Sequence, residues 1–254
     1  MHQSQRGQVT IYIIIAVVIV AFLAVVMTTR RPHSIETAPL AHEDYLAPAR
    51  AIAQDCLDSS LQGVMFDLGD GGRIDYQHPV ELYDGLVEAM SIDGTPHLPS
   101  MNQLASEASH LLDYEAEECI LQRLETEDAD RIRFPIKLGN VKTHISFAPT
   151  ATLATATIPL TVTVKGQSLS TEAFSSNALV RFPTIYSSAQ ALVLAAQDDP
   201  ARVNAELLLS LPVHVSLKTL SPTSYAYELH DPRSLLDGKP YLYRFVVAFG
   251  GVPS

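Results

Sequence analysis

The residues of this 254-residue chain best placed to do chemistry are its two cysteines, Cys56 and Cys119. Each lies on the apolar side of a segment with helical periodicity, so two helices packed antiparallel would bring the sulfur atoms together. A bridge would close a loop of about 64 residues and, in the chain-entropy treatment, stabilise the fold by about 4 kcal/mol. The even count favours a disulfide in an oxidising compartment, whereas a reducing compartment would leave two buried thiols.

The run Asp67-Leu68-Gly69-Asp70-Gly71-Gly72 carries part of a calcium-loop pattern. An EF-hand loop that began at Asp67 would need oxygen ligands where Gly69 and Gly71 stand, and a glutamate where His78 stands. The end of a helix followed by a tight turn explains the run better, because glycine accepts positive φ at such a position.

No other local pattern indicates a reaction. The histidines are scattered without metal-binding spacing, and no nucleophile elbow, phosphate loop or dinucleotide fingerprint occurs. Asp231, Ser234 and Asp237 surround a Gly-Lys-Pro turn and are typical of a loop. We therefore expect no catalytic, cofactor-binding or metal-binding residue. An enzyme is kept as a third hypothesis only because active sites can be assembled from dispersed residues.

The N-terminal segment predicts a membrane anchor. Val9 to Met27 is an uninterrupted run of uncharged, mostly aliphatic residues, followed by Arg30-Arg31-Pro32. At about 1.5 Å per residue such a helix nearly matches the roughly 30 Å core of a bilayer. A cleaved signal peptide would have a shorter apolar region and a small-residue cleavage site. We expect a head over 1–8, a single transmembrane helix over 9–29 and a linker over 30–42, with flanking charges too balanced to fix the orientation.

The opening Arg6-Gly7-Gln8-Val9-Thr10 and the aliphatic run after it resemble an uncharacterised family of archaeal single-pass membrane proteins with a prepilin-like (class III signal) start. The resemblance implies processing between Gly7 and Gln8, a cytoplasmic head and an extracytoplasmic remainder. Tyr12 replaces the usual glutamate of such signals, and Pro32 would interrupt a continuous pilin helix. The resemblance extends to both cysteines and to the D-x-x-S motif at 231–234, but it brings no established activity.

Composition restricts the partners. The net charge is −11, and the chain after residue 32 is more acidic still, because residues 1–32 contain three arginines and no acidic residue. Nucleic-acid binding needs a basic surface, so we expect no nucleic-acid partner. The expected partners are the lipid bilayer and proteins at the cell surface.

Apolar spacing predicts a helical region over 43–130. One helix runs from about Leu46 to the glycine-rich turn at 69–72. Another begins near Ser100, where Ser100 and Gln103 fit a capping box. Leu82, Leu86 and Met90 predict a shorter helix within 79–92.

Residues 131–254 predict a mixed region. Alternating residues over 131–182 indicate a β-meander with a hairpin turn at Lys165-Gly166-Gln167. Helices are expected over 185–197 and from Asp199-Pro200 to about Leu209, and strands over 213–217, 225–229 and 241–249. The predicted fold class is α+β, one N-terminal transmembrane helix followed by helices packed on antiparallel sheet.

The sequence thus predicts a membrane-anchored extracytoplasmic protein with a structural, binding or assembly role at the cell surface. A processed type IV pilin-like subunit is the alternative.

Overall fold

A computed structural model describes residues 45–125, 134–164, 166–198 and 204–249. The fold in these ranges is α+β, as predicted. The expected head, transmembrane helix and linker lie outside the described residues, as do Gly7 and Gln8. None of the helices in the described ranges combines the length and apolarity needed to cross a bilayer.

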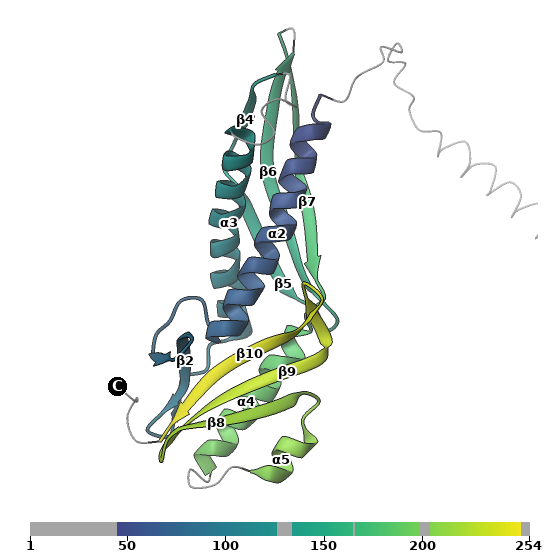
Figure 1. Ribbon diagram of the computed structural model, residues 1–254. Coiled ribbons are helices and arrows are strands. Elements are labelled where there is room, and N and C mark those ends of the chain that lie inside the picture. The colour runs from purple at the N-terminus through teal and green to yellow at the C-terminus, as the bar shows by residue number, and fades with distance from the viewer. Residues whose placement is uncertain (1–44, 126–133, 165, 199–203, 250–254) are drawn as a thin grey trace, which may run out of the picture. The chain divides into compact units, whose positions relative to one another are not determined.

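Two long helices, α2 (Ala47–Gly71) and α3 (Met101–Glu125), lie side by side and antiparallel (Figure 1). Both are predicted from their apolar spacing. The α2 helix ends at Gly72, whose φ of 75° is the left-handed conformation that glycine adopts readily. The capping box of α3 is confirmed: the Ser100 amide donates to Gln103 Oε1 (2.7 Å), and the Gln103 amide donates to Ser100 Oγ (3.2 Å).

The predicted β-meander is confirmed as an antiparallel sheet that packs against both helices (Figure 1). Its strands are β4 (Ile136–Leu138), β5 (Lys142–Phe147), β6 (Thr152–Val164) and β7 (Gln167–Ala178). The central strand β6 has β4 and β5 on one edge and β7 on the other. Alternate β6 residues are buried, because one face of the sheet covers α2 and α3.

A second sheet has the order β1-β2-β10-β9-β8, with β3 paired to β2. Its strands are β1 (Pro79–Leu82), β2 (Gly85–Ile92), β3 (Thr95–Pro96), β8 (His214–Ser221), β9 (Ser224–Leu236) and β10 (Lys239–Ala248). Within the described residues, the β2–β10 pair of this sheet is parallel and its other strand pairs are antiparallel. The helix α4 (Phe182–Asp198) lies against this sheet, and the short helix α5 (Ala205–Ser210) precedes β8 (Figure 1).

The predicted helix within 79–92 is wrong, because this segment forms the β1–β2 hairpin. Gly85, with φ of 146°, follows the turn, and β2 continues into parallel pairing with β10. A four-residue spacing of apolar side chains suits a helix locally, but pairing with a distant strand overrides it. Leu86, expected on the buried side of a helix, is 47% exposed.

Two later boundaries also differ from the prediction. Asp199-Pro200 lies outside the described residues, and α5 begins at Ala205 after Asn204, whose side chain accepts a hydrogen bond from the Leu207 amide (2.9 Å). The three closing strands are confirmed, but residues 231–234, expected in a loop, belong to β9.

One hydrophobic core includes residues from α2, α3, α4 and both sheets. The end of α2 meets β10 closely: the Tyr243 hydroxyl donates to the Gly72 carbonyl (2.8 Å). A Cβ atom added to Gly69 would lie 2.2 Å from the Leu242 carbonyl oxygen. The end of α2 therefore packs against β10 so closely that a side chain at Gly69 would not fit.

Candidate binding pocket

The outer edge of β9 changes its partner within a few residues. The strand β8 pairs with β9 as far as the pair His214–His230, and beyond it Leu179 forms a bridge with Leu235. Residues 231–234 lie between these partners. The β9–β10 register also shifts here, since Tyr241 pairs with Asp231 but Pro240 pairs with Leu235. Such a bulge re-aims side chains, and in this position it turns them toward the start of α4.

The bulge holds a closed polar network around Asp231, which is fully buried. The carboxylate accepts two hydrogen bonds from Arg181, from Nε (2.9 Å) and from Nη2 (2.6 Å). It also accepts hydrogen bonds from the Ser234 hydroxyl (2.5 Å) and the Arg233 amide (3.1 Å). The Arg181 amide donates to Ser234 Oγ (2.9 Å), so the segment before α4 is fixed to β9 at two points.

Both members of the ion pair stay charged. Burial raises the pKa of the Asp231 carboxyl, but the hydrogen bonds from Arg181, Ser234 and the Arg233 amide outweigh it, and the pKa lies below its ordinary value. Hydrogen bonding to Asp231 raises the pKa of the Arg181 guanidinium. A buried carboxylate with four donors is fully satisfied, so Arg181 is held in one orientation.

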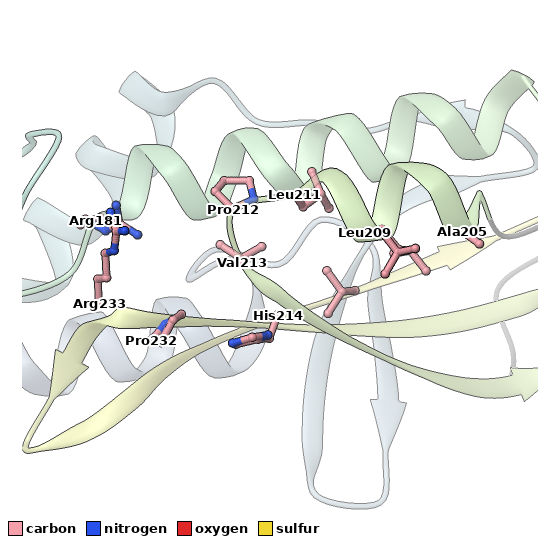
Figure 2. A pocket seen from close by; sticks show the side chains of 11 residues that line it. Arg181, Ala205, Leu209, Leu211, Pro212, Val213, His214, Pro232 and Arg233 are labelled. Atoms are coloured by element: carbon pink, nitrogen blue, oxygen red, sulfur yellow. The ribbon is translucent and has the colours of Figure 1, made fainter.

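An open pocket of about 820 Å³ adjoins this network, between α5, the start of β8 and the β9 bulge (Figure 2). Figure 2 shows the two arginines at one end and the α5 residues Ala205 and Leu209 toward the other. The polar side chains that line the pocket are Arg181, Arg233 and His214. Its other lining residues are apolar: Ala205, Leu208, Leu209, Leu211, Pro212, Val213, Val215 and Pro232.

The pocket carries an excess positive charge although the chain as a whole is acidic. Among the described residues, no carboxylate lines it. Asp231 forms an ion pair with Arg181 and neutralises it. The Arg233 guanidinium is exposed and makes no hydrogen bond or ion pair within the described part of the chain. One uncompensated guanidinium thus faces a pocket that, apart from the neutralised Arg181, is lined by His214 and eight apolar residues.

This arrangement can bind an anion that has an apolar part. Guanidinium groups present planar donor pairs that match a carboxylate or a phosphate. The volume lies within the range of about 300–1,000 Å³ that is usual for small-molecule sites.

The predicted pairing of Cys56 and Cys119 is confirmed. The two residues form a disulfide with a Cα–Cα distance of 5.7 Å, 63 residues apart in the sequence. It joins α2 to α3, and Cys56 is fully buried in the hydrophobic core. No free cysteine is present in the described residues.

The residues of the partial calcium-loop pattern lie apart from the pocket. Asp67, Gly69 and Gly71 belong to the last turns of α2, so the interpretation of this run as a helix end is confirmed. Asp70 accepts a hydrogen bond from Arg244 Nη2 (2.5 Å). Among the described residues, no group of three or more potential metal ligands is close enough to hold an ion.

Sequence reasoning missed Arg181 and Arg233. The available signal is the Asp231-x-x-Ser234 spacing, which in isolation predicts a loop. Arg181 lies 50 residues before its partner and has no local pattern that connects the two.

No protein-family model, curated protein or solved structure matches this chain.

Proposed function

We propose that the chain is a membrane-anchored extracytoplasmic protein whose folded part has a binding role at the cell surface. The observation that carries this proposal is the disulfide between α2 and α3. Disulfides form and persist in oxidising environments and are rare where glutathione and thioredoxin keep thiols reduced. The predicted transmembrane helix over 9–29 would anchor the chain, and the pocket at the β9 bulge is the binding site that we propose.

Thiol labelling and proteolysis on intact cells test the location. Cells are quenched with acid, and the denatured protein is treated with maleimide-polyethylene glycol with and without prior reduction. We expect no adduct without reduction and two adducts after it. A C56A variant should give one adduct without reduction, because Cys119 then has no partner. Protease added to intact cells should remove the region after Pro32.

Two results would contradict the proposal. Two reactive thiols in unreduced wild-type protein would place the cysteines in a reducing compartment. Full protection of the folded region, under conditions in which a known surface protein is digested, would place it inside the cell.

The second candidate, a processed pilin-like subunit, is favoured by the Gly7-Gln8 pair alone. N-terminal sequencing of the mature protein tests it. A chain that begins at Gln8 and copurifies with filaments would support this candidate, and an intact Met1 terminus would exclude processing.

A further inference from the structure

We propose that the pocket at the β9 bulge binds a small monocarboxylic acid with an apolar body. This inference rests on the binding role proposed above and names the class of ligand. The carboxylate would lie between Arg181 and Arg233, and the apolar body would lie along Leu208, Leu209 and Val213.

Arg181 is prepared to bind an anion. Its Nε and Nη2 donate to Asp231, whereas its Nη1 donates to no acceptor within the described residues. The ion pair fixes the direction of the guanidinium plane before any ligand arrives. Little conformational entropy is then lost when a ligand binds, and preorganisation of this kind increases affinity.

Arg233 supplies the charge that selects the ligand. Figure 2 shows its side chain extending from β9 toward Arg181 at one end of the pocket. Because Asp231 already neutralises Arg181, the pair of arginines offers a net charge of +1. A monoanion balances this charge, whereas a phosphate dianion would leave one negative charge uncompensated beside apolar walls.

The walls require an apolar ligand body. The helix α5 contains three consecutive leucines, and none of its residues is buried. Leu209 is 89% exposed. Covering exposed leucine side chains with an apolar ligand removes apolar surface from water and so favours binding. A carboxylate without an apolar body, such as acetate, would leave this surface in contact with water.

Calorimetric titration of the full chain in lipid nanodiscs tests the proposal, with empty nanodiscs as the baseline. The probe is 4-phenylbutyrate, compared with 4-phenylbutanamide, which keeps the shape without the charge, and with acetate, which keeps the charge without the ring. We expect binding of 4-phenylbutyrate, and affinities at least about tenfold lower for the other two, since a charge-assisted pair and an apolar surface are each worth about that factor.

The variant R233Q removes the guanidinium and should weaken 4-phenylbutyrate binding at least about tenfold and abolish its salt dependence. The matched control K218Q removes an exposed positive charge from β8, outside the pocket, and should bind as the wild type does. Because the Arg233 side chain has no partner within the described residues, R233Q should have the same midpoint urea concentration for unfolding as the wild type. An unchanged midpoint would show that any loss of binding does not come from unfolding of the variant.

Three results would overturn the proposal: equal binding by R233Q and wild type, equal binding of the acid and the amide, or no binding of 4-phenylbutyrate. If acetyl-Leu-Leu with a free carboxylate binds and 4-phenylbutyrate does not, the occupant is a polypeptide terminus and the small-acid proposal is wrong. The outcome is independent of the cell experiments: purified protein can bind the acid wherever the chain resides, and thiol labelling can place the chain whatever it binds.

Discussion

Replacement of both cysteines, C56A/C119A, should destabilise the folded region by about 4–5 kcal/mol. The bridge joins residues 63 positions apart. In the chain-entropy treatment a loop of this length restricts the unfolded chain by about 4 kcal/mol. Loss of the Cys56 sulfur from a fully buried position adds up to about 1 kcal/mol for the small cavity that alanine leaves.

Urea unfolding of the full chain in detergent measures this effect. The chain contains no tryptophan and ten tyrosines, so far-ultraviolet circular dichroism with tyrosine fluorescence as a second probe follows the transition. The denaturant slope m should increase in the variant, because an unfolded chain without the cross-link exposes more surface. Wild-type protein in excess reductant is the control, since it loses the cross-link but keeps both sulfur atoms in place.

The control separates the two contributions. Reduced wild type should lose about 4 kcal/mol, and the alanine variant should lose the same or slightly more. A loss below about 1 kcal/mol with an unchanged m value would refute the reasoning. The disulfide would then connect parts of the chain that already lie together when unfolded.

Three substitutions away from the disulfide should each change the free energy of unfolding in a predictable direction. D231N should destabilise the protein by about 3 kcal/mol at pH 7, because it removes the buried partner of Arg181. The pKa of Asp231 is lowered in the folded state, so the stabilisation is present above the ordinary carboxyl pKa and is lost as the pH falls through the folded pKa. Urea unfolding should therefore show a smaller stability difference between wild type and D231N at pH 3 than at pH 7. Burial and neighbouring acidic side chains raise the pKa of Glu115, so the stability of the wild type falls as the pH rises through the folded pKa of this group. By urea unfolding, E115Q should be more stable than wild type at pH 7 and equally stable at pH 3.5. G69A should destabilise the protein by about 2 kcal/mol in the same assay, because the new Cβ would collide with the Leu242 carbonyl oxygen. Helix propensity alone predicts a gain of about 1 kcal/mol, so a more stable variant would contradict this close contact.

The parts of the fold that were predictable are those determined by residues close together in the sequence. The apolar stripes of α2 and α3, the capping box at Ser100 and the alternation in β6 are local signals, and the structure confirms each. The disulfide was predictable because both cysteines lie on stripes that must face a common core. The hairpin at 79–92 was not, because its second strand is defined by pairing with β10, near the other end of the chain.

The pocket could not be predicted for the same physical reason. Asp231 and Ser234 are close in sequence, and in isolation their spacing suits a turn. Only the β9–β10 register shift and the distant Arg181 convert them into a buried network. No periodicity or motif contains that information.

The two arginines of the pocket should contribute differently to stability and to ligand binding. The Arg181 guanidinium is held by a buried carboxylate, so a change at Asp231 should alter stability and, through the orientation of Arg181, also ligand affinity. The Arg233 guanidinium has no such partner in the described residues, so its replacement should alter affinity and leave stability unchanged. If R233Q and D231N instead lost the same amount of stability, Arg233 would belong to the structural network. The excess charge that selects a monoanion would then be absent, and the pocket would have no group to bind the carboxylate.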